Sequence, residues 1–198
     1  MATLLQKGAD FGLVKSSGER YSKVIMALGW DAVRPGRSGY FGLFGGGGRE
    51  IDLDVSCLMF DKVGRLIDVV WFEQPVSKDG SIRHSGDNVT GRGAGDDERI
   101  HVDLELVPKW VQTLVFTINS FSGESFEQVG NSYCRIVDAT NDREVVRFAL
   151  EQVSGNHTAL IMARFYRQAG GWMMQSLGKP ARGKTFHDMM PALSEAYL

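Results

Sequence analysis

A two-residue alternation of apolar and polar side chains runs through most of this chain and limits its fold more than any other feature. The alternation is clearest in residues 51–59, which read IDLDVSCLM. Successive side chains of a β-strand point to opposite faces of the sheet, so this segment is predicted to be a strand with one buried face. Asp52 and Asp54 then share the other, polar face.

Further segments have the length and composition of short strands, and turn sequences separate them. They are residues 23–30, 66–72, 99–104, 112–119, 132–137, 144–150, 158–166 and 172–177. Helical periodicity is scarce. Residues 125–129 allow one short turn, and residues 185–198 form a predicted terminal helix that Pro191 interrupts. Many short strands with few helices predict an all-β fold, an antiparallel β-sandwich with a few short helices and a C-terminal helix.

The size and composition of the chain exclude several classes of protein. With 198 residues it fits one large domain, predicted as a sandwich over residues 1–178 and a tail with a short helix over residues 179–198. The net charge of −2 argues against nucleic-acid binding. Two cysteines, Cys57 and Cys134, exclude a disulfide scaffold and a cysteine-based zinc site. No apolar run is long enough for a membrane span and the N-terminus lacks the apolar core of a signal peptide, so a cytoplasmic location is predicted.

The most informative segment is the acidic, glycine-rich stretch 85–99, SGDNVTGRGAGDDER. Its adjacent carboxylates Asp96, Asp97 and Glu98 repel one another unless water, bases or a cation neutralise them. Glycines let the backbone turn its carbonyl oxygens inward, and calcium prefers such carboxylate, amide and carbonyl oxygens. The span Asp87–Glu98 has the length of an EF-hand loop but not its ligand spacing. Composition alone therefore leaves a metal site and a solvated acidic turn equally open.

The run from Arg83 to Glu98 resembles the signature of the TerD-like tellurite-resistance and stress proteins. Shorter segments that resemble the family follow in the same order, namely residues 28–31, 51–56, 125–129, 135–138, 163–167 and 171–172. The resemblance covers about residues 3–178. It implies a bacterial, calcium-binding β-sandwich with one or two Ca²⁺ ions and a role in resistance to tellurite, phage or colicins and in general stress. It brings no catalytic residues.

The resemblance implies calcium ligands at Asp87, Asn88, Asp96, Asp97 and Glu98, with Asp31, Asp52 and Asp54 as supporting ligands. Thr90 and the backbone carbonyls of residues 91–95 join this set. The alternation in residues 51–59 supports Asp52 and Asp54 as ligands, because it places both side chains on the polar face of the predicted strand. The chain departs from the family in its long glycine-aromatic loop 35–48, and in Arg92 and Ala94, which stand where acidic residues are common. One of two calcium sites is therefore expected to be weaker.

We expect a binding or scaffold protein that calcium orders, not an enzyme, because no base or nucleophile is evident near the acidic loop. The alternative is a metal-dependent enzyme acting on a phosphate-containing small molecule. Expected partners are other stress or tellurite-resistance proteins. The aromatic segment 40–44 predicts either a contact with a partner or a membrane surface, or a lid folded on the core.

Some remaining features have mainly structural interpretations. Residues 178–185, GKPARGKT, match a phosphate-binding loop, but too few residues follow to build the parallel sheet that such loops need. The apolar stripe of Phe186–Leu198 predicts a helix that packs on the sandwich or, alternatively, docks a partner or a second copy of the chain. Cys57 is expected to be a core thiol, whereas the alternation leaves Cys134 open. The histidines, including His84, lack ligand spacing and are expected at the surface or supporting a site.

Overall fold

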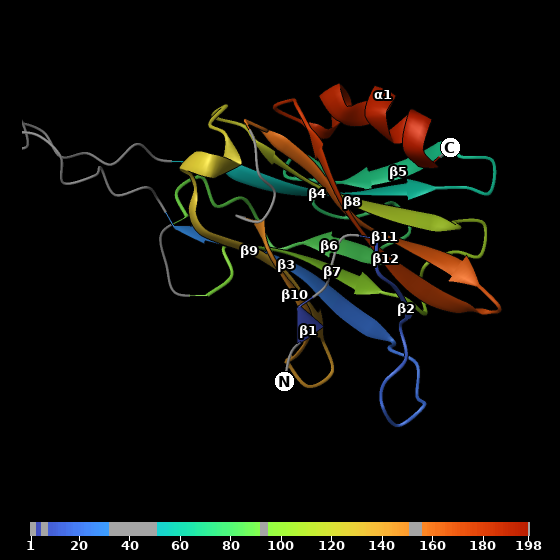
Figure 1. Ribbon diagram of the computed structural model, residues 1–198. Helices are drawn as coiled ribbons and strands as arrows, with labels where there is room; N and C mark the ends of the chain where they lie inside the picture. The colour runs from blue at the N-terminus through green and yellow to red at the C-terminus, as the bar shows by residue number, and fades with distance from the viewer. Residues whose placement is uncertain (1–2, 5–7, 32–50, 92–94, 151–155, 198) are drawn as a thin grey trace, which may run out of the picture.

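The computed structural model describes residues 3–4, 8–31, 51–91, 95–150 and 156–197, and in these ranges the chain forms two sheets packed face to face (Figure 1). The first sheet has the order β1 (Thr3–Leu4), β10 (Arg143–Ala149), β9 (Gly130–Asp138), β3 (Lys23–Asp31), β7 (Glu98–Asp103) and β6 (Ile82–His84). The second sheet has the order β2 (Asp10–Gly12), β12 (Gly171–Ala181), β11 (Ala159–Gln168), β8 (Thr113–Ser120), β4 (Leu53–Phe60) and β5 (Leu66–Val70). In the described ranges these strands pair antiparallel, apart from β1 with β10. The predicted antiparallel β-sandwich is confirmed.

Every segment that the sequence predicts as a strand overlaps a strand of the structure. Strands β1, β2 and β6 are absent from the prediction because each has only two or three residues, too few to show an alternation. The short turn predicted at residues 125–129 is a 3₁₀ helix, η1 (Phe126–Gln128).

The core lies between the two sheets and consists mainly of the apolar side chains that the predicted alternation places on the inner face of the strands. Alternate side chains of β4 from Leu53 to Met59 face inward. Phe116 of β8 and Phe165 of β11 meet there with their ring centroids 4.8 Å apart. Cys57 and Cys134 both lie in this core, where burial raises the pKa of each thiol. The predicted role of Cys57 as a core thiol is confirmed.

Helix α1 (Phe186–Tyr197) covers the outer face of the second sheet (Figure 1). Its apolar stripe packs against Leu58 of β4 and Val115 of β8, which confirms that the helix packs on the sandwich. Pro191 lies inside the helix rather than interrupting it. A proline removes one N–H donor from a helix, and the packing of the turns on both sides of Pro191 keeps this helix continuous.

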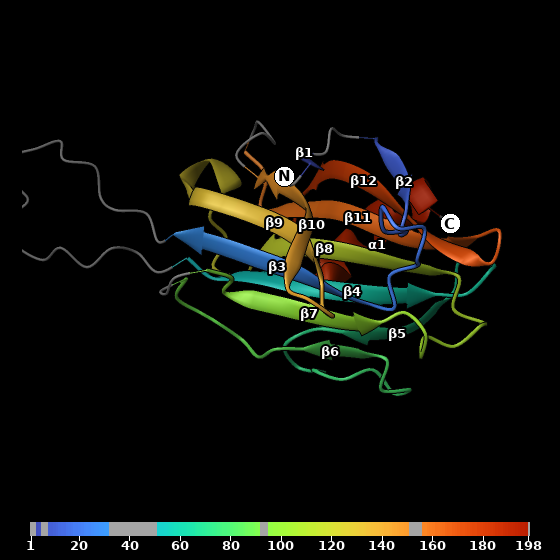
Figure 2. The same cartoon turned by 90° about the horizontal axis from the view of Figure 1, so that it is seen from below.

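The outer face of the first sheet lies on the opposite side of the molecule from α1. Figure 2, seen from that side, shows β9, β3 and β7 in front and α1 behind them. In the described part of the chain, no helix has the length and apolar character needed to cross a membrane. The glycine-aromatic loop 35–48, with its segment 40–44, lies outside the described residues.

Candidate metal centre

Glu98, the first residue of β7, is fully buried and connects three parts of the chain. Its Oε2 accepts the N–H of Val55 (2.9 Å). Val55 belongs to the first part of β4, because the pairing of β4 with β5 begins only at Cys57. Its Oε1 accepts the N–H of Asn88 (3.2 Å). His84 Nε2 lies 3.3 Å from the same Oε2 that Val55 uses. The Glu98 carboxylate thus joins the acidic loop to the edge of β4.

Three other carboxylates meet beside this connection and form what we call the acidic cluster, Asp52, Asp54 and Asp87. Each places an oxygen within 4.8 Å of the oxygens of the other two. Asp54 is buried, Asp52 is half-buried and Asp87 is exposed, so the cluster reaches solvent on the side of the loop. Asp52 Oδ1 is inaccessible and has no hydrogen-bond partner among the residues that the structure describes. A buried acceptor without a donor is costly unless another group, such as a cation, satisfies it.

The acidic cluster shifts the ionisation of its own members. Burial, reinforced by the negative charges of Asp87 and Glu98, raises the pKa of Asp52 to about 6. Burial and the charges of the neighbouring carboxylates raise the pKa of Asp54 to about 8. At neutral pH Asp54 therefore favours its protonated form, whereas a nearby cation would favour the carboxylate.

Asn88 and Asp97 hold the acidic loop in shape. Asn88 Nδ2 donates to Asp97 Oδ1 (2.9 Å), and Asn88 Oδ1 accepts the N–H groups of Thr90 and Gly91 (both 3.2 Å). Asp97 Oδ2 accepts the N–H of Trp30 (2.9 Å), which anchors the loop to β3. Burial raises the pKa of Asp97, although the hydrogen bond from Trp30 opposes the shift. Both side chains therefore serve hydrogen bonds within and next to the loop.

Asp96 is neutralised by bases on the outer face of the first sheet. Its carboxylate accepts hydrogen bonds from Arg135 Nε (2.8 Å), Arg99 Nε (3.0 Å) and the hydroxyl of Tyr133 (3.1 Å). Burial alone would raise the pKa of Asp96, but the hydrogen bond and charge of Arg135 lower it below its usual value. The three consecutive acids of the loop thus have three different surroundings.

The residues that the sequence predicts as ligands fall into three groups. The residues of the first group lie close together in the acidic cluster. Those of the second group form hydrogen bonds next to the cluster, and those of the third group form hydrogen bonds away from it. The first group is Asp52, Asp54 and Asp87, the second is Asn88, Asp97 and Glu98, and the third is Asp96 and Asp31. Asp31 Oδ2 accepts Asn131 Nδ2 at 2.6 Å. Residues 92–94, with the predicted Arg92 and Ala94 departures, lie outside the described ranges.

Sequence reasoning missed Asn119 and did not predict the burial of His84. Asn119 of β8 stands opposite Asp54 in the β4–β8 register, and its Nδ2 lies 3.4 Å from Asp54 Oδ2. His84 is buried at the end of β6, and its Nδ1 accepts the N–H of Gly86 (3.1 Å). Alternation within a strand gives no register between strands, so it carries no signal for Asn119. For His84 the available signal is its place directly before the acidic loop.

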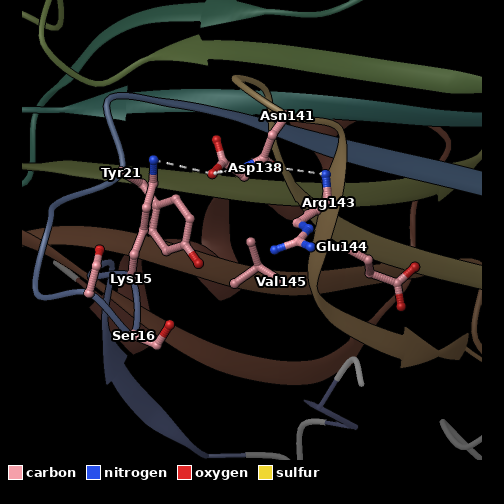
Figure 3. Close-up of a pocket in the computed structure, with 9 residues that line it drawn as sticks. Lys15, Ser16, Tyr21, Asp138, Asn141, Arg143, Glu144 and Val145 are labelled. Carbon is pink, nitrogen blue, oxygen red and sulfur yellow. Dashed lines mark hydrogen bonds and ion pairs between the residues drawn. The ribbon is translucent and has the colours of Figure 1, made fainter.

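A separate cleft of about 660 Å³ lies between the β2–β3 connection and the β9–β10 turn (Figure 3). Lys15 Nζ lies 3.4 Å from Oδ2 of Asp138, whose side chain is almost inaccessible. Asp138 also accepts hydrogen bonds from the hydroxyl of Thr140 (2.6 Å) and from Asn141 Nδ2 (3.0 Å). This buried acid therefore has a base and several donors, whereas Asp52 Oδ1 has no donor among the described residues.

Comparison with known proteins finds consistent matches over almost the whole chain. The profile of the TerD domain family matches residues 1–192. The tellurium resistance protein TerZ of Serratia marcescens is 42% identical over 185 residues, 93% of each chain. The stress response protein SCP2 of Bacillus subtilis (strain 168) is 35% identical over 197 residues, 96% of this chain and 98% of that one. A solved homologue of telluride resistance protein (TerD) from Streptomyces coelicolor A3(2) has a TM-score of 0.69 at 22% identity, over 84% of this chain and 94% of that one, which supports the fold.

Proposed function

Because this chain belongs to the TerD domain family, we propose that it is a calcium-binding β-sandwich that acts as a binding or scaffold module in tellurite resistance and stress response. In this proposal it works in the cytoplasm with other stress or tellurite-resistance proteins. The names of its relatives support the role in resistance and stress, and the acidic cluster supports the calcium.

The observation that carries the proposal is the convergence of the Asp52, Asp54 and Asp87 carboxylates, together with the buried Asp52 Oδ1, for which the described residues provide no donor. Asp96 shows how the same chain treats an acid that needs no metal, because Arg135 and other donors neutralise it. Among the described residues, no Lys or Arg forms such an ion pair with the acidic cluster. Carboxylates this close repel one another, and a divalent cation offsets that repulsion.

The donor set of the acidic cluster fits calcium. Its members are hard carboxylate oxygens, and calcium takes six to eight oxygen ligands at roughly 2.3–2.6 Å. Both cysteines of the chain are core thiols, so the cluster offers no soft ligand that would favour zinc or copper. Bound calcium would supply the positive charge that keeps Asp52 and Asp54 ionised and draws the acidic loop toward β4. The exposure of Asp87 leaves room for water ligands.

Glu98 gives the acidic cluster its geometry without being one of the three converging ligands. It accepts the N–H of Val55 next to Asp54 and the N–H of Asn88 next to Asp87. The two sides of the cluster are therefore held by one buried carboxylate. The proposal requires one ion at the cluster, and the second ion that the family resemblance implies stays a prediction.

Melting curves in calcium, magnesium and chelator test the calcium site. At a hundredfold excess over the dissociation constant, binding stabilises the folded state by about 2.7 kcal/mol. For a chain of this size the melting temperature should rise by roughly 5–10 °C. Asp87→Asn is expected to remove the shift, and Asp142→Asn, which changes the charge equally at an exposed turn, to keep it. Identical curves in calcium and chelator would contradict the proposal.

The metal-dependent enzyme stays an alternative prediction from the sequence. A generic phosphoester substrate separates it from the scaffold role. Turnover that requires a divalent cation and disappears in Asp87→Asn would favour the enzyme, whereas calcium binding without turnover of the phosphoester would favour the scaffold.

A further inference from the structure

The outer face of the second sheet changes from apolar to polar along β4 and β8. Beneath α1 the cross-strand pair Leu58 and Val115 is apolar and packs against the helix. Two pairs further along the same face, Asp54 stands opposite Asn119, and Thr117 lies between these ends. All of these side chains are nearly inaccessible, so the polar end of the face is covered as well as the apolar end.

Asn119 contacts both the acidic cluster and the C-terminal segment. Its Nδ2 donates to the backbone carbonyl of Lys184 and lies 3.4 Å from Asp54 Oδ2. The side chain is about 1% exposed, and within the described ranges its Oδ1 has no hydrogen-bond partner. One amide group, buried beside Asp54, therefore connects the predicted metal ligand to the segment that precedes α1.

Further contacts hold this C-terminal segment on the sheet. The N–H of Gly183 donates to Thr158 Oγ1 (3.1 Å). Asp188 Oδ2 accepts the N–H groups of Lys184 (2.8 Å) and Thr185 (3.2 Å), which caps the start of α1. A Cβ on residue 183 would approach the Cβ of Asp188 to 2.4 Å, so the turn is closely packed. The carbonyl of Lys184 is thereby presented to Asn119.

We infer that Asn119 is a positioning residue of the calcium site and couples calcium binding to the docking of residues 182–197. The inference rests on the proposed function. With its Nδ2 directed at both the Lys184 carbonyl and Asp54, Asn119 holds the Asp54 oxygen best while the C-terminal segment is docked. In this inference calcium binding requires that Asp54 is held in this way, so bound calcium stabilises the docked state of the C-terminal segment. By linkage, docking strengthens calcium binding by the same factor.

Proteolysis by a lysine-specific protease that needs no calcium measures this coupling. The exposed Lys184 reports on the C-terminal segment, and the exposed Lys62 in the β4–β5 turn reports on general stabilisation. Cleavage after Lys184 requires local opening of the segment, whereas Lys62 lies at the far end of β4 from the acidic cluster. We expect calcium to slow cleavage at Lys184 about fivefold more than cleavage at Lys62.

Two variants separate coupling from a general effect on stability. Asn119→Leu should abolish the selective protection of Lys184 and raise the calorimetric Kd for calcium about fivefold, because Asp54 loses a donor. Asp188→Ala loosens the segment without touching the cluster, so it should speed cleavage at Lys184 and, by reciprocity, raise the calcium Kd about threefold. Ser194→Ala on the exposed side of α1 is the matched control and should change neither.

The outcomes distinguish this inference from the proposed function. Calcium binding without selective protection of Lys184, or an unchanged calcium Kd in Asp188→Ala, overturns the coupling and leaves the calcium site intact. No calcium binding to the wild-type chain overturns both. If Asn119→Leu does not fold, the exposed Asp188→Ala variant decides alone, because its side chain lies on the surface.

Discussion

Gly91 lies so close to Trp30 that a Cβ on residue 91 would come within 2.2 Å of the indole Nε1. That Nε1 donates to the carbonyl of Ile51 (2.9 Å), the residue before Asp52. Gly91 also has a φ of +56°, in the left-handed region. The indole therefore joins the acidic loop to the start of β4, and the loop approaches it through a residue without a side chain.

Gly91→Ala should destabilise the protein because alanine adds both a steric clash with Trp30 and strain at a positive φ. We expect a loss of about 2–4 kcal/mol, or a melting temperature lower by roughly 4–16 °C, and a weaker calcium shift. Gly170→Ala is the matched control, since Gly170 has a φ of +74° but a Cβ added there would meet none of the described atoms within 4 Å. Equal losses in the two variants would mean that the indole contact adds nothing.

Asp54→Asn should stabilise the metal-free protein while removing its response to calcium. The folded-state pKa of Asp54 is raised to about 8, above its unfolded value near 4, so the folded state binds more protons between these pH values. Stability in chelator therefore falls as the pH rises through this window. The neutral amide removes this fall, together with the repulsion from Glu98, Asp52 and Asp87.

Melting temperatures in chelator from pH 5 to pH 9 check the Asp54 prediction. In chelator, the melting temperature of Asp54→Asn should increase relative to that of the wild type as the pH rises. Calcium should raise the melting temperature of the wild type but not that of Asp54→Asn. Asp142→Asn carries the same charge change at an exposed turn and should follow the wild type. A difference between Asp54→Asn and wild type that does not change with pH would show that burial and the neighbouring carboxylates do not raise the pKa of Asp54.

The strands were predictable from the sequence because alternation is a local property. Residues 51–59 show it directly, and the structure has β4 at Leu53–Phe60. The pairing of β4 with β8 is not local, so the position of Asn119 opposite Asp54 could not be derived from either strand. The same holds for α1, whose apolar stripe was predictable but whose place over Leu58 and Val115 depends on the sheet order.

The acidic loop shows why a ligand set is harder to predict than a strand. Asp96, Asp97 and Glu98 are adjacent, and composition treats them as equivalent oxygen donors. In the structure Asp96 meets Arg135, Asp97 meets Trp30, and Glu98 is buried next to β4. Each partner comes from a distant part of the chain. Side-chain direction in an irregular loop depends on these partners and not on a repeating pattern.

Asp96→Asn should destabilise the protein and leave its calcium response intact. The substitution leaves Arg135 and Arg99 without their shared carboxylate, and Arg135 is largely buried in this pair. We expect a loss of about 2 kcal/mol, reduced from that of a fully buried pair because Arg99 reaches solvent. The melting temperature should fall by roughly 4–8 °C in chelator, with the calcium shift unchanged.

Calorimetric titration of Asp96→Asn with calcium decides between two roles for this residue. An unchanged Kd supports the ion-pair role that its arginine partners indicate. A Kd raised more than tenfold would instead support the sequence prediction that Asp96 is a calcium ligand. Asp87→Asn in the same experiment provides the loss expected for a residue of the acidic cluster, which is proposed to bind the ion.

Asp138→Asn should weaken the protein at neutral pH but not in acid. Burial alone would raise the pKa of Asp138, but hydrogen bonds from Thr140 and the charge of Lys15 lower it below its usual value. A lowered folded-state pKa adds stability above the unfolded pKa near 4, and this stability is lost as the pH falls through the folded-state value.

The Asp138→Asn variant should therefore lose about 1–2 kcal/mol of folding stability at pH 7. Urea unfolding at pH 7, 5, 4 and 3 measures the difference, which should shrink below about pH 4, where the unfolded chain takes up a proton at Asp138 before the folded state does. A loss of equal size at pH 7 and pH 3 would show that the side-chain shape of Asp138, and not its charge beside Lys15, supports the β9–β10 turn.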